Sequence, residues 1–427
     1  MEKIKIKVVD EVIYHERLEN GLDVYVYKKP GFQKKSAFFQ TKYGSLNNDF
    51  VPINKSKMKS FPLGIAHFLE HKLFESSDDA NVFEAFEKNG AYVNAATSLD
   101  KTYYYFSAPD HFYDNLKLLL DMVQSPYFTD ENVEKEKGII GQEIDMYDNN
   151  PDEFLYSKLF YNLINGSPLK YNIAGTKKSV KNITKDDLYE CYNTFYHPSN
   201  MFLVVVGDVL ENKVISFVKE NQKAKKFPLA KRIIKKEYEE KQSVETKEAT
   251  FFHNVVSPKI GYAYKLLLPK LEPREDFLRS FYVWLFMSTK FNATSGFNEQ
   301  LIKDKLVKSY FNGDYVLKDN ILVIYFIGDV IDDAGVRKRI EDALRNLDDL
   351  KAGFDLYRKS NLAGVVRRFE SPDAVQSFIR SQVNNYGFIF DDVYELYKGA
   401  SYDDYLKFIK TLNFDNSVKV IIKSKEE

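Results

Sequence analysis

Two histidines and a glutamate lie within five consecutive residues, His67-Phe68-Leu69-Glu70-His71, and this short motif restricts the chain more than any other feature. On a helix, residues four apart stand one turn above each other and project from the same face. The imidazoles of His67 and His71 can therefore bind one metal ion together. Glu70 lies beside them, where a carboxylate can accept a proton from water. The motif predicts a helix that carries two metal ligands and a base.

The alternative is an amphipathic helix whose two histidines share a face by chance. The chain has six histidines in all, which makes an accidental H-x-x-E-H rare. Phe68, Leu69, Leu73 and Phe74 supply apolar side chains at helical spacing. The helix therefore has a stripe to bury, and the three polar residues border that stripe. H-x-x-E-H is the inverzincin signature, which favours the metal site.

A catalytic zinc usually takes a third protein ligand and keeps one position for water. Glu136 and Glu143 are seven residues apart, so on a helix they share one face. A solvated helix is the alternative, and it is the preferred interpretation for Glu131 and Glu134. For Glu143 the apolar neighbours within 139–144 favour an interior position. A carboxylate there needs a compensating charge, which zinc would provide.

Four segments resemble the insulinase/pitrilysin family of zinc metallopeptidases, and within it the short-chain branch related to mitochondrial processing peptidase. They are residues 64–75, 90–98, 136–143 and 196–208. The resemblance covers the N-terminal half densely and in order. The C-terminal half matches in length and general pattern.

The resemblance implies that His67, His71 and Glu143 are zinc ligands and that Glu70 is the general base. Glu136 would orient one of the ligands by a hydrogen bond. The residue types suit this chemistry, because two neutral imidazoles and one carboxylate leave the site positive and lower the pKa of bound water. Glu70 would take the proton of that water and return it to the leaving amine.

The segment Asn94-Ala95-Ala96-Thr97 matches a family segment that forms an edge strand and pairs with extended substrate. Small residues let another backbone approach, and an open sheet edge can accept a peptide strand. A polar turn after Gly90 is the alternative on the residues alone. The resemblance favours the substrate strand.

Composition bounds the remaining possibilities. With 427 residues, 44% of them hydrophobic, the chain can build several cores. Its net charge of −1 gives no reason to expect nucleic acid, and the basic run at 223–232 is interpreted as a linker. Its apolar runs are too short to span a membrane. The alternation at 1–7 indicates a strand and not a signal peptide. Cys191 is the single cysteine, which excludes an internal disulfide and suits the cytoplasm.

The pattern of strands and helices occurs twice, which predicts an α+β fold built from two homologous units. Asn200 before the strand at 202–206 has its counterpart in Asn416 before 418–422. We expect a zinc-bearing domain at 1–222, a linker at 223–243 and a metal-free domain at 244–427. The family arranges such halves, each a mainly antiparallel sheet packed on helices, as a clam around a peptide-binding chamber.

In the family, the C-terminal unit often contributes an Arg and, seven residues later, a Tyr that contact substrate. The matching positions here are Lys303 and Tyr310. The ammonium group of Lys cannot replace the planar guanidinium group of Arg, which donates two hydrogen bonds side by side. Many short-chain members pair with a zinc-free subunit that supplies this Arg and Tyr. We therefore expect a heterodimer with such a partner, with a homodimer as the other possibility.

These observations together predict a cytoplasmic zinc endopeptidase with one Zn²⁺ per chain that cleaves short or unfolded peptides. The alternative is a non-catalytic or structural subunit of a peptidase-like complex. All four residues that the chemistry needs are present, which favours the enzyme.

Overall fold

The computed structural model describes residues 1–75, 82–292, 295–309 and 311–425. The chain forms two compact units, and each of them combines several segments. Unit 1 comprises residues 1–144, 172–237 and 366–392, and unit 2 comprises residues 145–171, 238–365 and 393–427. The zinc-motif residues all belong to unit 1.

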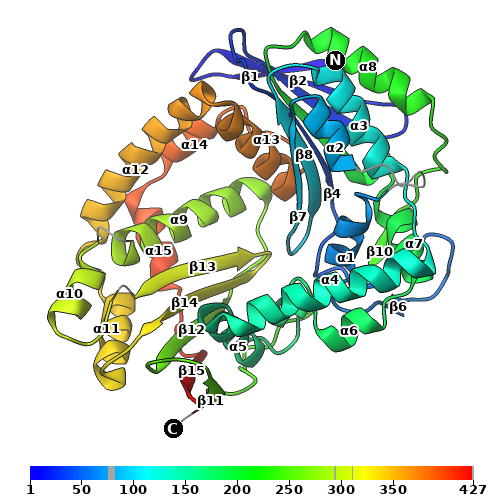
Figure 1. The fold of residues 1–427 in the computed structure, drawn as a ribbon. Helices are drawn as coiled ribbons and strands as arrows, with labels where there is room; N and C mark the ends of the chain where they lie inside the picture. The colour runs from blue at the N-terminus through cyan, green and yellow to red at the C-terminus, as the bar shows by residue number, and fades with distance from the viewer. Residues whose placement is uncertain (76–81, 293–294, 310, 426–427) are drawn as a thin grey trace. The chain divides into compact units, whose positions relative to one another are not determined.

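Unit 1 is built on a seven-stranded sheet in the order β1-β2-β3-β9-β4-β8-β7 (Figure 1). β3 and β9 are parallel, and the other neighbours are antiparallel. The strands are β1 (Glu2–Ile6), β2 (Glu11–Arg17), β3 (Asp23–Lys28), β4 (Lys35–Thr41), β7 (Tyr92–Thr97), β8 (Thr102–Ala108) and β9 (Met201–Gly207). A small second sheet joins β10 (Ile234–Lys235), β5 (Asp49–Val51) and β6 (Lys59–Ser60).

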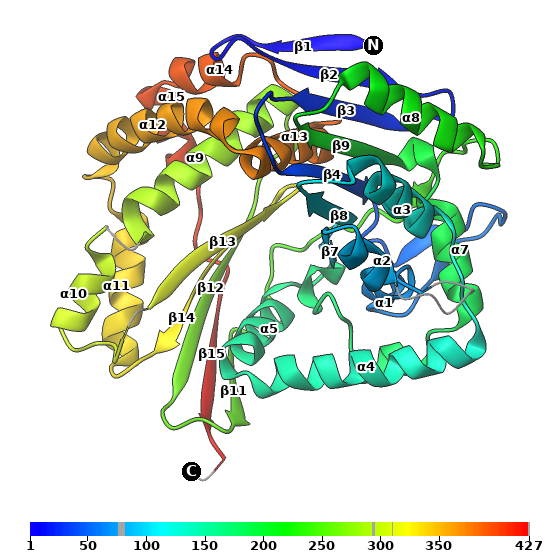
Figure 2. The ribbon, with the colours of Figure 1, turned by 45° about the horizontal axis from the view of Figure 1, so that its top comes forward.

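Helices cover both faces of the large sheet. β8 alternates buried and half-buried residues, so its odd and even positions face opposite sides. On one side Phe106 contacts the ring of Phe112 in α3. On the other side Arg380 of α13 stacks 3.9 Å above the ring centroid of Phe38 in β4. Figures 1 and 2 show the orange α13 beside the blue strands, although it lies far from them in sequence.

The helices of unit 1 are α1 (Ile65–Lys72), α2 (Val82–Lys88), α3 (Phe112–Gln124), α4 (Asp130–Asn149, assigned to unit 1 through Ile144), α6 (Lys177–Lys181), α7 (Lys185–Phe195), α8 (Glu211–Lys223) and α13 (Pro372–Tyr386), with 3₁₀ turns η2 (Pro198–Asn200) and η3 (Arg368–Glu370).

Unit 2 is built on a five-stranded sheet in the order β11-β15-β12-β14-β13. The strands are β11 (Glu248–His253), β12 (Lys259–Leu267), β13 (Asn312–Lys318), β14 (Ile321–Asp329) and β15 (Ser417–Ser424). The helices are α5 (Pro151–Leu163), α9 (Pro273–Phe291), α10 (Phe297–Lys303), α11 (Asp333–Arg345), α12 (Leu350–Arg367, assigned to unit 2 through Val365), α14 (Val393–Gly399) and α15 (Tyr402–Lys410), with the 3₁₀ turn η1 (Pro168–Lys170).

The unit 2 sheet is also covered on both faces. α5 approaches so closely that a Cβ at Gly261 of β12 would stand 2.5 Å from Cδ1 of Leu159. On the opposite face Tyr264 packs with aromatic side chains that include Phe326 and Phe414. Burial on both faces explains why the middle of β12 is almost entirely buried.

The predicted α+β class is confirmed, and the strand order repeats between the units. β3-β9-β4-β8-β7 and β11-β15-β12-β14-β13 have the same connectivity and the same strand directions. β9 and β15, which follow Asn200 and Asn416, occupy equivalent places in this order. That the halves are homologous stays a prediction.

The compact units do not follow the single division expected at 223–243. α5 precedes that segment yet packs in unit 2, and α13 follows it yet packs in unit 1. The expected linker itself is shared, because β10 pairs with β5 while Glu240 bonds to Lys265. The positions of α5 and α13 in the sequence therefore do not indicate which of the two sheets each helix packs against. Within the described ranges no helix has the length and apolarity needed to cross a membrane.

Candidate metal centre

The first two candidate ligands lie on α1, whose start is fixed by a close backbone contact. Gly64 caps the helix with φ 86°, a left-handed conformation that favours glycine. A Cβ at Gly64 would stand 2.2 Å from the carbonyl oxygen of Ala174, so only glycine fits there. This contact places the first turn of α1 against residues 174–175.

His67 and His71 project from one face of α1, as the spacing predicts. Their ring centroids lie 4.6 Å apart and the ring planes are inclined at 63°. Most of the short helix is buried, including His67 and Glu70. The apolar residues Ile65, Phe68 and Leu69 anchor it, each with no exposed surface.

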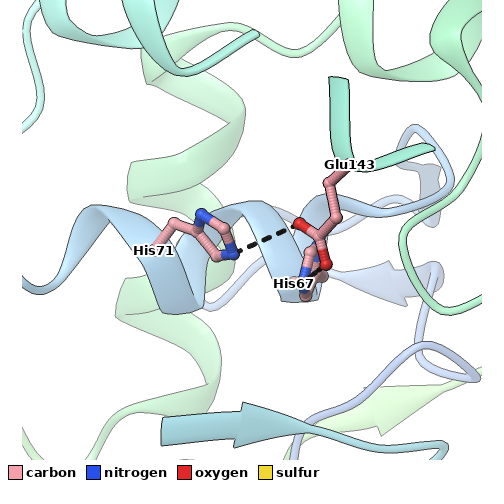
Figure 3. A group of neighbouring side chains, drawn as sticks. All are labelled: His67, His71 and Glu143. Carbon is pink, nitrogen blue, oxygen red and sulfur yellow. Dashed lines mark ion pairs between the residues drawn. The ribbon is translucent and has the colours of Figure 1, made fainter. Parts of the chain in front are cut away.

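The third candidate ligand comes from α4, and the structure brings it to the two histidines. Nε2 of His67 lies 3.6 Å from one carboxylate oxygen of Glu143, and Nε2 of His71 lies 3.7 Å from the other. One donor atom from each residue lies within 4.8 Å of the others (Figure 3). Val133, Ile140 and Ile144 anchor α4 in the interior and hold this face of the helix toward α1.

These three donors suit a zinc ion. Zinc accepts imidazole nitrogen and carboxylate oxygen at about 2.0–2.2 Å, and donors arranged tetrahedrally at those lengths stand about 3.3–3.5 Å apart. The two imidazoles face different oxygens of Glu143, at 3.6 and 3.7 Å, and one donor atom from each residue lies within 4.8 Å of the others. Small shifts of the side chains would bring the three donors to that spacing. Nδ1 of His67 is buried and has no hydrogen-bond partner in the described part of the chain. No hydrogen bond at Nδ1 therefore competes with the orientation in which Nε2 of His67 faces Glu143.

Glu136 acts on His71 from the far side of the imidazole. Its Oε1 lies 2.8 Å from Nδ1 of His71, and only 6% of the residue is exposed. An acceptor at Nδ1 keeps the proton there and turns the lone pair of Nε2 toward Glu143. The expected orienting role of Glu136 agrees with this geometry.

The electrostatics of the two histidines differ. Burial and the neighbouring His71 lower the pKa of His67 to about 4, so this imidazole is neutral near pH 7. Burial also opposes protonation of His71, but the hydrogen bond and the charge of Glu136 outweigh it and raise the pKa of His71. A proton therefore competes with a metal mainly at His71.

Glu70 lies beside the ligands and is held by the end of a strand. It is 8% exposed, and its Oε2 accepts a hydrogen bond of 2.6 Å from the hydroxyl of Thr97. Burial raises the pKa of Glu70, and the bond from Thr97 acts in the opposite direction. A buried carboxylate with a raised pKa is suited to accept a proton and release it again.

The candidate substrate segment forms β7, the last strand of the unit 1 sheet. β8 pairs with one edge of β7, and in the described part of the chain no strand pairs with the other edge. Asn94 shapes this edge, since its side chain donates to the hydroxyl of Tyr92 and accepts from the amide of Ala95. Ala96 and Thr97 complete the strand toward Glu70.

Two further candidates from the sequence are Lys303 and Tyr310. Lys303 is the last residue of α10 in unit 2. Tyr310 lies outside the described residues. Their expected contact with substrate stays a prediction.

Sequence reasoning missed two contacts at this site. Thr97 was expected to bind substrate, and its hydroxyl bonds to Glu70. Lys72 follows His71 directly and is completely buried. The position of Lys72 between His71 and the apolar pair Leu73-Phe74 was the available signal for the second.

Two family patterns match the chain. The sequence pattern described as Insulinase (Peptidase family M16) matches residues 60–177, and the pattern described as Peptidase M16 inactive domain matches residues 182–358. The fold and site thus define an M16 metallopeptidase-like protein, and the chain belongs to the insulinase family. The predicted membership is confirmed.

Individual relatives carry matching descriptions. The chain is 40% identical over 388 residues to an uncharacterized zinc protease, YmfH, of Bacillus subtilis, covering 90% of each chain. It is 32% identical to a mitochondrial-processing peptidase beta subunit of Arabidopsis thaliana over 37% of this chain and 30% of that one. A solved M16-like peptidase structure from Alicyclobacillus acidocaldarius matches with TM-score 0.87 and 30% identity, over 97% of this chain and 98% of that one.

Proposed function

We propose that this chain is a zinc-dependent endopeptidase that hydrolyses short or unfolded peptides, with His67, His71 and Glu143 as the metal ligands and Glu70 as the general base. The observation that carries the proposal is the convergence of three donor atoms within 4.8 Å beside the buried Glu70. Relatives named zinc proteases support the same class.

The roles of the protein groups follow from their positions. Zinc, when bound, lowers the pKa of water and polarises the scissile carbonyl. Glu70 accepts the proton of the attacking water and passes it to the leaving amine. Thr97 holds the carboxylate of Glu70 in place, and Glu136 holds His71 in the tautomer that leaves Nε2 free to ligate.

Substrate would add to the open edge of β7 as an extended strand. Backbone hydrogen bonds then supply affinity without demanding a particular sequence. The small side chains of Ala95 and Ala96 leave room for a second backbone. This binding mode explains why short or unfolded peptides, whose backbones are free to pair, are the proposed substrates.

The decisive experiment is the variant Glu70→Gln. It keeps the shape of the side chain and removes the base, so we expect zinc content to stay at wild type while peptide hydrolysis falls about 100- to 10,000-fold. Glu131→Gln is the matched control, because Glu131 is an exposed carboxylate on α4. Wild-type hydrolysis by Glu70→Gln would refute the assignment of the base.

The same variants test the alternative, a non-catalytic or structural subunit. In that case the purified chain has no hydrolytic activity for Glu70→Gln to remove, whether or not it holds zinc. We favour the enzyme because the ligand set and the base occur together.

We further propose that the chain is the catalytic subunit of a heterodimer with a zinc-free homologue. Lys303 in place of the expected Arg supports a partner that supplies this group, and one relative is named as a beta subunit. Light scattering during size-exclusion chromatography, together with peptide assays with and without the product of the neighbouring gene, tests this. Full activity of the isolated monomer would refute it.

We place the protein in the cytoplasm. Cys191 is a free, buried thiol, and burial raises its pKa well above the usual range, so it is an inert packed side chain. Fractionation of cells that express the tagged full chain tests this location.

A further inference from the structure

Lys72 is a buried cation that no step of the proposed chemistry uses. It is the last residue of α1, directly after His71, and none of its surface is exposed. Its Nζ lies 2.5 Å from a carboxylate oxygen of Glu75 and donates to the carbonyl oxygen of Asn132 at 3.2 Å. It therefore joins the end of α1 to the first turn of α4.

Stability alone does not account for this side chain. Burying an ammonium group costs several kcal/mol, and one ion pair recovers that cost only with very good geometry. Glu75 is 33% exposed, so water screens part of the attraction. An apolar side chain of similar length would avoid this cost. Buried charges of this kind are best attested where they fix one packing register.

Lys72 can fix the packing register of α4 against α1, that is, which turn of α4 lies beside which residue of α1. Asn132 and Glu136 are one turn apart on the same face of α4. His71 bonds to Glu136 and Lys72 bonds to Asn132, so two consecutive residues of α1 hold two consecutive turns of α4. Glu143 lies two turns beyond Glu136 on that face.

The anchor point on α4 is itself well fixed. The side chain of Asn132 accepts from the amide of Thr129, and the hydroxyl of Thr129 accepts from the amide of Asn132. The side chain of Asn132 also donates to the carbonyl of Tyr127. A carbonyl held in this way gives Lys72 a firm point of attachment.

We propose that Lys72 is a positioning residue, which sets the register of α4 so that Glu143 stands opposite His67 and His71. The inference rests on the proposed zinc site and adds a residue outside its ligand set. Removing Lys72 deletes one of two polar links beside the ligands, so the carboxylate of Glu143 spends less time in ligand position.

The test is zinc affinity, measured by chelator competition on the full-length variant Lys72→Met. Methionine keeps the unbranched apolar chain and removes the charge. We expect zinc binding to weaken about 10- to 100-fold, the usual effect of losing a group that orients a ligand. The melting temperature without metal stays the same or rises, since the desolvation cost disappears. The absorption spectrum of the cobalt-substituted protein changes, because a ligand has shifted.

Lys265→Met is the matched control. Lys265 is equally buried and also pairs with a carboxylate, but it lies in unit 2. This variant should lose stability and keep wild-type zinc affinity. The single variant Lys72→Met could fail to fold because Glu75 loses its ion-pair partner. The double variant Lys72→Met/Glu75→Gln removes both charges and then takes its place in the zinc assay. The same weakening of zinc binding is expected.

The outcomes separate the two proposals. Wild-type zinc affinity and cobalt spectrum in whichever of the two Lys72 variants folds would overturn the role of Lys72 and leave the peptidase intact. A wild-type chain that binds neither zinc nor cobalt would overturn both.

Discussion

Replacing Thr97 by valine keeps nearly the same side-chain shape and removes the hydroxyl, with its hydrogen bond to Glu70 and a longer contact of 3.3 Å to the hydroxyl of Thr102. In the native chain the hydroxyl of Thr97 donates to Glu70 at 2.6 Å, a length typical of a bond to an ionised carboxylate. Hydrogen bonds to charged groups contribute about 1.5–3 kcal/mol. We expect Thr97→Val to lower kcat by about 10- to 100-fold, since about 1.4 kcal/mol corresponds to a factor of ten in rate.

The pH dependence gives this prediction a direction. The bond from Thr97 stabilises the charged form of Glu70 and so lowers its pKa against the effect of burial. Without the bond the pKa of Glu70 rises further, and the carboxylate becomes protonated at a higher pH. The acid limb of the kcat profile therefore moves to higher pH in Thr97→Val, and part of the lost activity returns as the pH increases.

The assay is hydrolysis of an internally quenched peptide over a pH series, with kcat and KM determined separately. KM should change little, because the backbone edge of β7 is unaltered. Thr97→Ser keeps the hydroxyl and should retain the native acid limb. A Thr97→Val enzyme with wild-type kcat and an unmoved acid limb would show that the bond does not act on the base.

Three other perturbations have defined outcomes. Zinc affinity should fall about tenfold per pH unit once the pH drops below the raised pKa of His71. Glu136→Gln lowers that pKa, so in this variant the fall in zinc affinity should begin at a lower pH. Chelator competition at several pH values checks both outcomes. Gly64→Ala forces a side chain into a left-handed position against a carbonyl and should cost at least about 1–2 kcal/mol in thermal unfolding, with weaker zinc binding. Lys265→Met leaves the buried carboxylate of Glu240 with two amide hydrogen bonds but without its cation, and should destabilise unit 2 by about 3–5 kcal/mol in calorimetry, while zinc content stays constant.

The ligand helices were predictable because their information is local. Helical spacing alone places His67 and His71 on one face, and apolar neighbours alone indicate that Glu143 turns inward. The helix expected to carry Glu136 and Glu143 on one face is α4, Asp130–Asn149. Strong periodicity over many residues outweighs errors at single positions.

Contacts between distant segments could not be predicted in the same way. Thr97 reaches Glu70 because the end of β7 lies against α1, and nothing in the local sequence of either element encodes that meeting. The amphipathic pattern of α13 predicts a helix with one buried face without naming the sheet that buries it. Its place in unit 1 therefore depends on contacts with segments far from it in the sequence.

The repeated strand order also suggests why the chain would carry one metal site. In unit 1 the connection from β4 to β7 contains α1, a mostly buried short helix that carries two of the three candidate ligands. In unit 2 the equivalent connection, from β12 to β13, contains α9, which buries a set of large aromatic and aliphatic side chains. Among the described residues only His67, His71 and Glu143 form a cluster that could hold a metal. The topological position that holds two candidate metal ligands in unit 1 is therefore occupied in unit 2 by a helix that serves core packing.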